Sequence, residues 1–123
     1  FEQQGADFIF PVAGGMQSAT AGNSIKSKKS KVIWVDAAVM DTGKQYASVT
    51  PVSALKGLKE GVLATVKEAY DGKFSNTPYV GTLKNKGVSY VITPSWSSKI
   101  PAKLQKDLKG IAADIAAGIV TVD

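Results

Sequence analysis

Cysteine and histidine are both absent from this chain of 123 residues. Without thiols the chain can have neither a disulfide framework nor a cysteine nucleophile. Without imidazoles it has no histidine-dependent catalytic triad, and a zinc site of the usual Cys and His type is excluded. No G-x-G-x-x-G fingerprint and no P-loop is present, and no apolar stretch approaches the roughly 18 residues of a membrane span. We therefore expect no catalytic residues, no metal and no cofactor.

Arginine is missing as well, because all 15 basic residues are lysines. Ten acidic residues leave a formal net charge of +5. Proteins that read nucleic acids use arginine for bidentate contacts to guanine and phosphate, so specific nucleic-acid binding is not expected. The densest run of lysines lies in residues 26–31. We interpret this run as an exposed loop, with an anion site as the alternative.

The remaining composition is typical of one globular domain, with 44% hydrophobic and 20% charged residues. A chain of this length is long enough to bury a core. Its first five residues look like the last turn of a helix that is closed by a glycine cap at Gly5. We therefore expect the chain to be a segment of a longer protein.

Two apolar strands end at residues that suit a ligand. Residues 7–12 predict a buried strand, and the pair Gly14-Gly15 after it opens a predicted helix over 16–25. Residues 32–35 predict a second strand, which ends at Asp36. A strand, a helix and a strand within about thirty residues indicate a right-handed βαβ unit. Ligands of open α/β sheets bind at the carboxyl ends of the strands, so these two ends form the candidate site.

The rest of the chain also predicts an α/β fold, with a parallel sheet and flanking helices. Residues 37–46 are expected to form an irregular loop. Apolar residues at helical spacing predict a helix over 53–70, with Ser53 as its N-cap. The other expected elements are a strand-like piece at 47–52, a small β hairpin of 79–83 with 88–93, a last helix from Pro101 to Gly118 and an edge strand at 119–122.

Three residues at the two strand ends are candidates for ligand binding. Gly14 and Gly15 would expose backbone N–H groups near a helix N-terminus, which suits an anion or a hydroxyl group. The other reading is a tight turn that needs small residues. Asp36 could accept two hydrogen bonds from a vicinal diol, or it could be an ordinary N-cap or loop carboxylate.

Two further residues are candidates on weaker grounds. Lys56 is predicted to lie in the first turn of the 53–70 helix, where a cation opposes the helix dipole, and this suggests either a function or plain surface. Trp96 follows Pro94 in a predicted loop and is a candidate ligand contact. Trp34 lies inside a predicted strand and is expected to belong to the core.

Taken in order, six segments resemble the basic membrane protein (BMP) family of bacterial substrate-binding lipoproteins. This family delivers nucleosides to ABC transporters and has the type I periplasmic-binding-protein fold of two α/β lobes. The resemblance extends over nearly the whole chain and matches only the C-terminal part of the family. The segments are 5–15, 32–36, 53–56, 70–74, 87–88 and 100–101.

The resemblance implies a nucleoside-binding component without catalysis, in which Gly14 or Gly15 contacts the ribose, Asp36 binds its hydroxyls and Lys56 adds a charged hydrogen bond. It implies that residues 1–46 and about 94–123 belong to the C-terminal lobe, and that about 47–93 form the crossover and N-terminal-lobe elements. The implied partners are a nucleoside, a permease of the ABC transporter and the missing N-terminal lobe. The implied location is extracytoplasmic, with a lipid anchor outside this chain.

Two other functions remain open on the residues alone. A doubly wound α/β enzyme could use Asp36 and Lys56 as an acid–base pair. A phosphate- or anion-binding regulatory domain could use the Ser- and Thr-rich stretch after Gly15.

Overall fold

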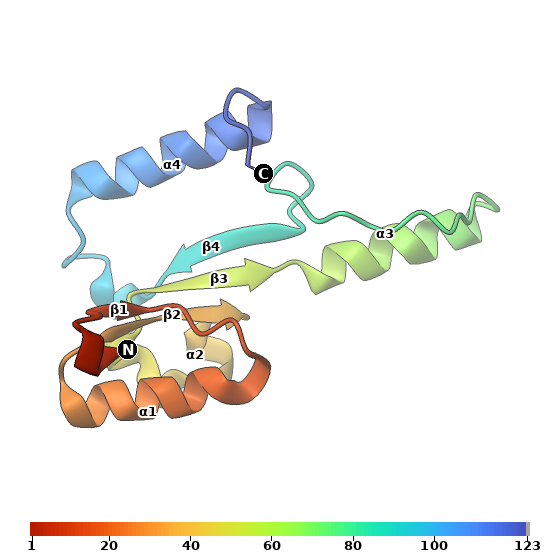
Figure 1. Cartoon of the computed structure of the whole chain (residues 1–123). Coiled ribbons are helices and arrows are strands. Elements are labelled where there is room, and N and C mark those ends of the chain that lie inside the picture. Colours follow the sequence, from red (N-terminus) through yellow and green to blue (C-terminus); the bar gives the residue numbers. More distant parts are fainter. Residues whose placement is uncertain (123) are drawn as a thin grey trace. The chain divides into compact units, whose positions relative to one another are not determined.

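A computed structural model of the chain describes residues 1–122 (Figure 1). Short 3₁₀ turns (η) alternate with strands and helices along these residues. The strands are β1 (Phe8–Ile9), β2 (Lys31–Asp36), β3 (Val52–Lys56) and β4 (Val88–Ile92). The α-helices are α1 (Gln17–Ser27), α2 (Val39–Thr42), α3 (Leu58–Tyr70) and α4 (Ala102–Ala117). The 3₁₀ turns are η1 (Glu2–Gln4), η2 (Gly14–Met16), η3 (Lys44–Val49) and η4 (Pro94–Trp96).

The four strands form one sheet in the order β1-β2-β3-β4. β1 and β3 both run parallel to β2, with Ile9 opposite Val32 and Asp36 opposite Leu55. β4 runs antiparallel to β3. Its direction follows from two hydrogen bonds, in which Thr93 N–H donates to the carbonyl of Pro51 at 2.9 Å and Gly57 N–H donates to the carbonyl of Gly87 at 2.9 Å.

The chain divides into two compact units. The first unit consists of Phe1–Leu55 and Tyr90–Pro101, and the second consists of 56–89 together with the residues from 102 onward. Each unit is built from two separate stretches of sequence, so the chain passes from one unit to the other three times.

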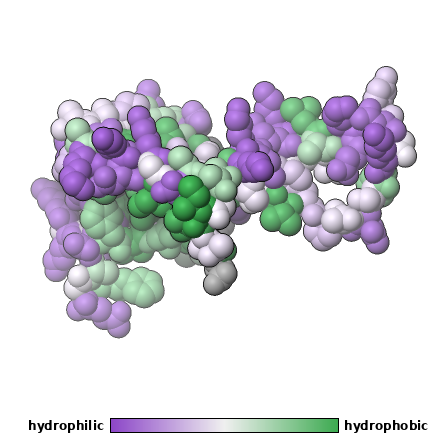
Figure 2. Space-filling model, turned by 90° about the horizontal axis from the view of Figure 1, so that it is seen from above, coloured by the Kyte–Doolittle hydropathy of each residue, from purple (hydrophilic) through white to green (hydrophobic). Residues whose placement is uncertain are grey.

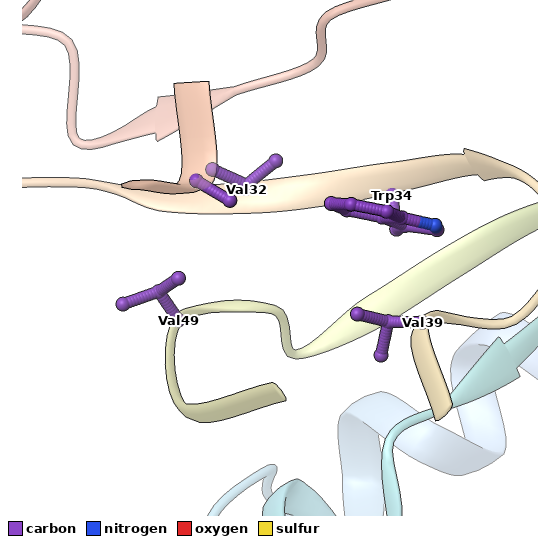
Figure 3. Close-up of a cluster of buried hydrophobic side chains, with 5 residues drawn as sticks. Val32, Trp34, Val39 and Val49 are labelled. Atoms are coloured by element: carbon purple, nitrogen blue, oxygen red, sulfur yellow. The ribbon is translucent and has the colours of Figure 1, made fainter. Parts of the chain in front are cut away.

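The buried core lies in the first unit, where β2 packs against α1, α2 and η3 (Figure 3). Val32 and Trp34 of β2 are buried together with Val39 of α2 and Val49 of η3. The Trp34 ring stacks on Tyr46 with centroids 5.7 Å apart. Its indole N–H donates to the Thr42 hydroxyl at 3.0 Å, which satisfies the one polar group of this buried side chain.

The described part of the second unit buries no hydrophobic side chain. Neither α3 nor α4 contains a buried residue. Leu58 and Val62 of α3 are 69% and 61% exposed. In Figure 2, hydrophobic side chains coloured green lie open on the segment at the right, which contains α3. This unit therefore lacks the buried apolar area that stabilises a domain.

The α/β class with a sheet and flanking helices is confirmed, and several boundaries predicted from sequence are close. The predicted strand at 32–35 is β2, and Trp34 belongs to the core. The helix expected over 16–25 is α1, which continues through Gly22 and Asn23 to Ser27. The prediction of a buried strand over 7–12 is wrong in length and in burial, since β1 contains only Phe8 and Ile9 and Phe8 is 56% exposed.

The prediction that a helix begins at Ser53 is wrong. Ser53 lies in β3, fully buried, and its hydroxyl accepts a hydrogen bond from Val39 N–H at 3.1 Å. Helix α3 begins at Leu58 after Gly57 as its N-cap. Pairing of Val52–Leu55 with β2 takes these residues out of the helix, so tertiary structure overrides the local helical spacing.

The first strand of the predicted β hairpin is also absent, since residues 79–83 form no strand. The side chain of Asn85 replaces the ladder by binding the backbone around it. Its Oδ1 accepts from Thr82 N–H at 2.8 Å and from Gly87 N–H at 2.9 Å, and its amide donates to the Val80 carbonyl at 2.9 Å. These bonds satisfy the local polar groups without a second strand.

Three smaller expectations fail for local reasons. Residues 44–49 form η3, so the strand expected over 47–52 starts only at Val52. The loop expected over 37–46 contains α2. No strand forms over 119–122, because the N–H groups of Ile119 and Val120 donate to the carbonyl of Asp114 and close the end of α4.

Candidate functional site

Gly14, Gly15 and Asp36 lie at one edge of the first unit. β1 and β2 are parallel, so both strands leave the sheet on the same side. Ile9 is opposite Val32, and β2 continues from there to Asp36, whereas β1 ends at Ile9 and residues 10–13 turn outside the strand before Gly14. The glycine pair thus follows the carboxyl end of β1, and Asp36 is the carboxyl end of β2, which is the side of an open α/β sheet where ligands bind.

The glycine pair forms an exposed turn with open space beside it. Gly14 has a φ of 58°, in the left-handed region that favours glycine, and it starts η2. A Cβ built on either Gly14 or Gly15 would meet no atom within 4 Å. Gly15 needs neither a positive φ nor room for a neighbouring side chain, so no steric requirement of the fold explains its lack of a side chain.

Asp36 has a strained backbone. Its φ is 73°, and the N–H of Ala37 donates to the carbonyl of Val35 at 2.9 Å across it. A positive φ with a hydrogen bond from residue i+2 to residue i defines the rare form of the γ-turn. Such strain persists where surrounding structure holds it and is concentrated at binding sites. The turn ends β2, and Asp36 is half-buried there.

Lys56 is the last residue of β3 and not part of a helix. It follows Leu55, the residue opposite Asp36, and belongs to the second unit. The unfavourable interaction with a helix dipole that first suggested a function does not apply, because α3 begins two residues later. Lys56 is exposed and lines one end of a groove of about 550 Å³ in its own unit.

Trp96 lies in η4 of the first unit and is half-buried. Its indole N–H donates to the carbonyl of Ala47 at 2.9 Å, and the ammonium group of Lys99 is 4.8 Å from the centroid of its ring. These contacts hold the indole ring against η3. A ligand contact by Trp96 stays a prediction.

Glu2 organises a polar cluster that sequence reasoning missed. Its Oε1 accepts hydrogen bonds from the hydroxyls of Ser30 at 2.6 Å and Ser27 at 2.8 Å, and its Oε2 accepts one from the amide of Asn23 at 3.0 Å. The hydrogen bond from Ser30 is the main cause that lowers the pKa of the Glu2 carboxyl. The lysine-rich turn is therefore held to η1. No local pattern signals a contact between residues 28 positions apart.

Within residues 1–122, no three His, Cys, Asp or Glu side chains come together in a way that could hold a metal ion. None of the helices in that range is long and apolar enough to cross a membrane.

Comparison with known proteins gives a likeness in structure. Neither a protein-family model nor a curated protein matches the chain. Among solved structures, an ABC transporter system solute-binding protein from Conexibacter woesei is similar over 99% of this chain, with a TM-score of 0.62 and 14% sequence identity. The chain covers 39% of the length of that protein. A likeness at this identity shows the fold, so the chain has the α/β architecture of part of a solute-binding protein.

Proposed function

We propose that this chain is part of the substrate-binding component of an ABC importer, and that it carries the ribose side of a nucleoside-binding cleft. The single observation that carries the proposal is the strained γ-turn of Asp36 at the sheet edge shared with Gly14 and Gly15. The fold shared with a solute-binding protein supports it.

Each residue of the proposed site has a separate task. The carboxylate of Asp36 accepts hydrogen bonds from the vicinal 2′ and 3′ hydroxyls of the ribose, because its two oxygens match the spacing of a diol. The open backbone at Gly14 and Gly15 allows the sugar to approach closely. The resemblance to the BMP family adds Lys56 as the donor of a charge-assisted hydrogen bond to the ribose. Trp96 contributes a ring that can contact the ligand.

The proposed function is binding without catalysis. Asp36 and Lys56 act as hydrogen-bonding groups and carry no acid–base step. The shared fold belongs to a solute-binding protein, which favours this role over the enzyme and over the anion-binding regulatory domain. The nucleobase is read by residues outside these 123 positions, so the chain contributes sugar recognition and not base specificity.

The proposal includes a setting for the protein. A substrate-binding component works outside the cytoplasm and delivers its ligand to a permease, and a lipid anchor on the parent protein would hold it at the membrane. Residues 1–46 and about 94–123 would belong to the C-terminal lobe, and about 47–93 to the crossover and the N-terminal lobe. These assignments rest on the resemblance to the BMP family.

Isothermal titration calorimetry on the intact gene product tests the function. Guanosine, adenosine, inosine and uridine are titrated into the wild-type protein and into the Asp36→Asn and Lys56→Ala variants. We expect at least one nucleoside to bind, and both variants to bind it more weakly. Absence of binding by all four nucleosides, or binding that neither variant changes, contradicts the proposal. Conversion of a nucleoside to product would favour the enzyme.

A further inference from the structure

Helix α3 presents a row of large apolar side chains that nothing in its own unit covers. Leu58, Val62 and Val66 are spaced four residues apart and therefore lie on one face of the helix. Their exposed fractions are 69%, 61% and 59%. This α3 face is not a scatter of single exposed residues, since the three side chains are neighbours along one row.

The α3 face forms one wall of an apolar groove. Tyr79 packs on the helix at Gly61, where an added Cβ would lie 3.2 Å from the ring. Gly81, Gly87 and Val88 continue the lining, and the groove has a volume of about 550 Å³. A Cβ on Gly87 would collide with the Cα of Gly81, so two backbone segments lie close together here. The groove is thus built on a closely packed support.

The second unit also lacks a core of its own among its described residues. Every buried hydrophobic side chain of residues 1–122 belongs to the first unit. A compact unit needs buried apolar area to offset the entropy of ordering its chain. The α3 face is an exposed apolar surface from which such a core could be completed.

We infer that the α3 face is half of a lobe core, and that its occupant is the part of a solute-binding fold that has no counterpart in these 123 residues. This inference rests on the proposed function. The occupant is inferred from the lengths of the two proteins. The structural likeness to the solute-binding protein from Conexibacter woesei covers 99% of this chain but only 39% of that protein. More than half of such a fold is therefore available to cover the groove.

The occupant is an apolar layer with few charges. The large apolar side chains that line the groove are Leu, Val and Tyr, and Lys56 is the one charged residue of the lining. A segment that fills it matches by hydrophobic burial and shape, in the way that two layers of one domain pack. A second copy of this chain is the competing occupant.

Single-cysteine labelling tests this inference directly, because the chain has no native cysteine. Val62→Cys places a thiol on the α3 face, and Glu68→Cys places one on an exposed polar position of the same helix. Each substitution is made in the 123-residue chain and in the intact gene product, and the rate of maleimide labelling is measured without ligand. Circular dichroism confirms that each variant is folded.

We expect Cys at position 62 to label rapidly in the 123-residue chain and more slowly in the intact protein, by about tenfold or more. Cys at position 68 should label at the same rate in both. Equal rates at position 62 overturn the inference, as does a gene product no longer than this chain. Slow labelling at position 62 in the 123-residue chain, together with self-association in sedimentation equilibrium, would assign the α3 face to a second copy. That result also overturns the inference. Failure to bind nucleosides leaves these rates unchanged, so the two proposals fail separately.

Discussion

The hydroxyl of Ser30 donates a hydrogen bond of 2.6 Å to the carboxylate of Glu2, across 28 positions of sequence. Ser30 is fully buried, and its oxygen also lies 2.7 Å from the hydroxyl of Ser24 in α1. Glu2 therefore joins η1 to the turn between α1 and β2. The bonds form with the ionised carboxylate, which gives them a dependence on pH.

Replacing Glu2 with Gln should remove a pH-dependent part of the stability. The pKa of the Glu2 carboxyl is lowered in the folded chain from its ordinary value of 4.5, chiefly by the hydrogen bond from Ser30. A lowered pKa stabilises the fold fully above the unfolded value, and this contribution is lost as pH falls through the folded value. Urea unfolding should show that wild type is more stable than Glu2→Gln at pH 7, and that this difference in unfolding free energy shrinks as the pH falls below the unfolded pKa of Glu2. A difference that grows on acidification contradicts the assignment.

Gly43→Ala should destabilise the first unit. The added Cβ would lie 2.6 Å from Cζ2 and 2.8 Å from Cη2 of Trp34, whose buried ring has no room to move. Overpacking of this kind costs about 1–3 kcal/mol. Gly110→Ala in α4 is the matched control, because no atom lies within 4 Å of its Cβ and alanine favours a helix by about 0.5–1 kcal/mol. Thermal unfolding should rank Gly110→Ala at or above wild type and Gly43→Ala below it.

Gly15→Ala should weaken nucleoside binding and leave the stability of the fold nearly unchanged. No neighbour obstructs the new methyl group and Gly15 has no positive φ, so the unfolding free energy should change by less than about 0.5 kcal/mol. The methyl group occupies space assigned to the sugar, and nucleoside affinity should fall about tenfold, or ~1.4 kcal/mol. Unchanged affinity in calorimetry would remove Gly15 from the site.

Gly14→Ala carries a backbone penalty in addition, since φ is 58° there. Gly72→Ala is its matched control, with a φ of 68° and no atom within 4 Å. Both variants should lose about 1 kcal/mol of stability. Only Gly14→Ala should weaken nucleoside binding, and an equal effect of both variants on affinity would argue for an indirect cause.

Local sequence pattern was sufficient where local interactions decide the structure. The apolar run that ends at Asp36 forms β2, and the spacing of Leu104, Leu108 and Ile115 marks α4, which ends at Gly118 with a φ of 76°. Asp36 was found as a strand end for the same reason, whereas Gly14 and Gly15 follow the end of β1 only after four further residues. The sequence did not predict the γ-turn at Asp36, because aspartate occurs in many loops.

The sequence pattern gave wrong predictions where an interaction other than the local periodicity determines the structure. Leu55 continues the helical spacing of α3, yet it lies opposite Asp36 in the sheet. Ser53 reads as an N-cap, yet its hydroxyl binds the start of α2 from a neighbouring strand. Asn85 prevents a second hairpin strand through three side-chain bonds that no alternation of apolar residues reveals. The partners of Leu55 and Ser53 lie outside the local window, whereas Asn85 binds residues within five positions of itself.

The most direct test of the central claim compares a ribonucleoside with its 2′-deoxy analogue in wild type and in Asp36→Asn. Asparagine tolerates a positive φ, so the γ-turn is kept while the negative charge is lost. A charged hydrogen bond contributes about 1.5–3 kcal/mol, so Asp36→Asn should weaken ribonucleoside binding by about 10–100-fold and weaken deoxynucleoside binding much less. Equal losses for the two ligands, or no loss for either, would contradict a ribose-binding role for Asp36.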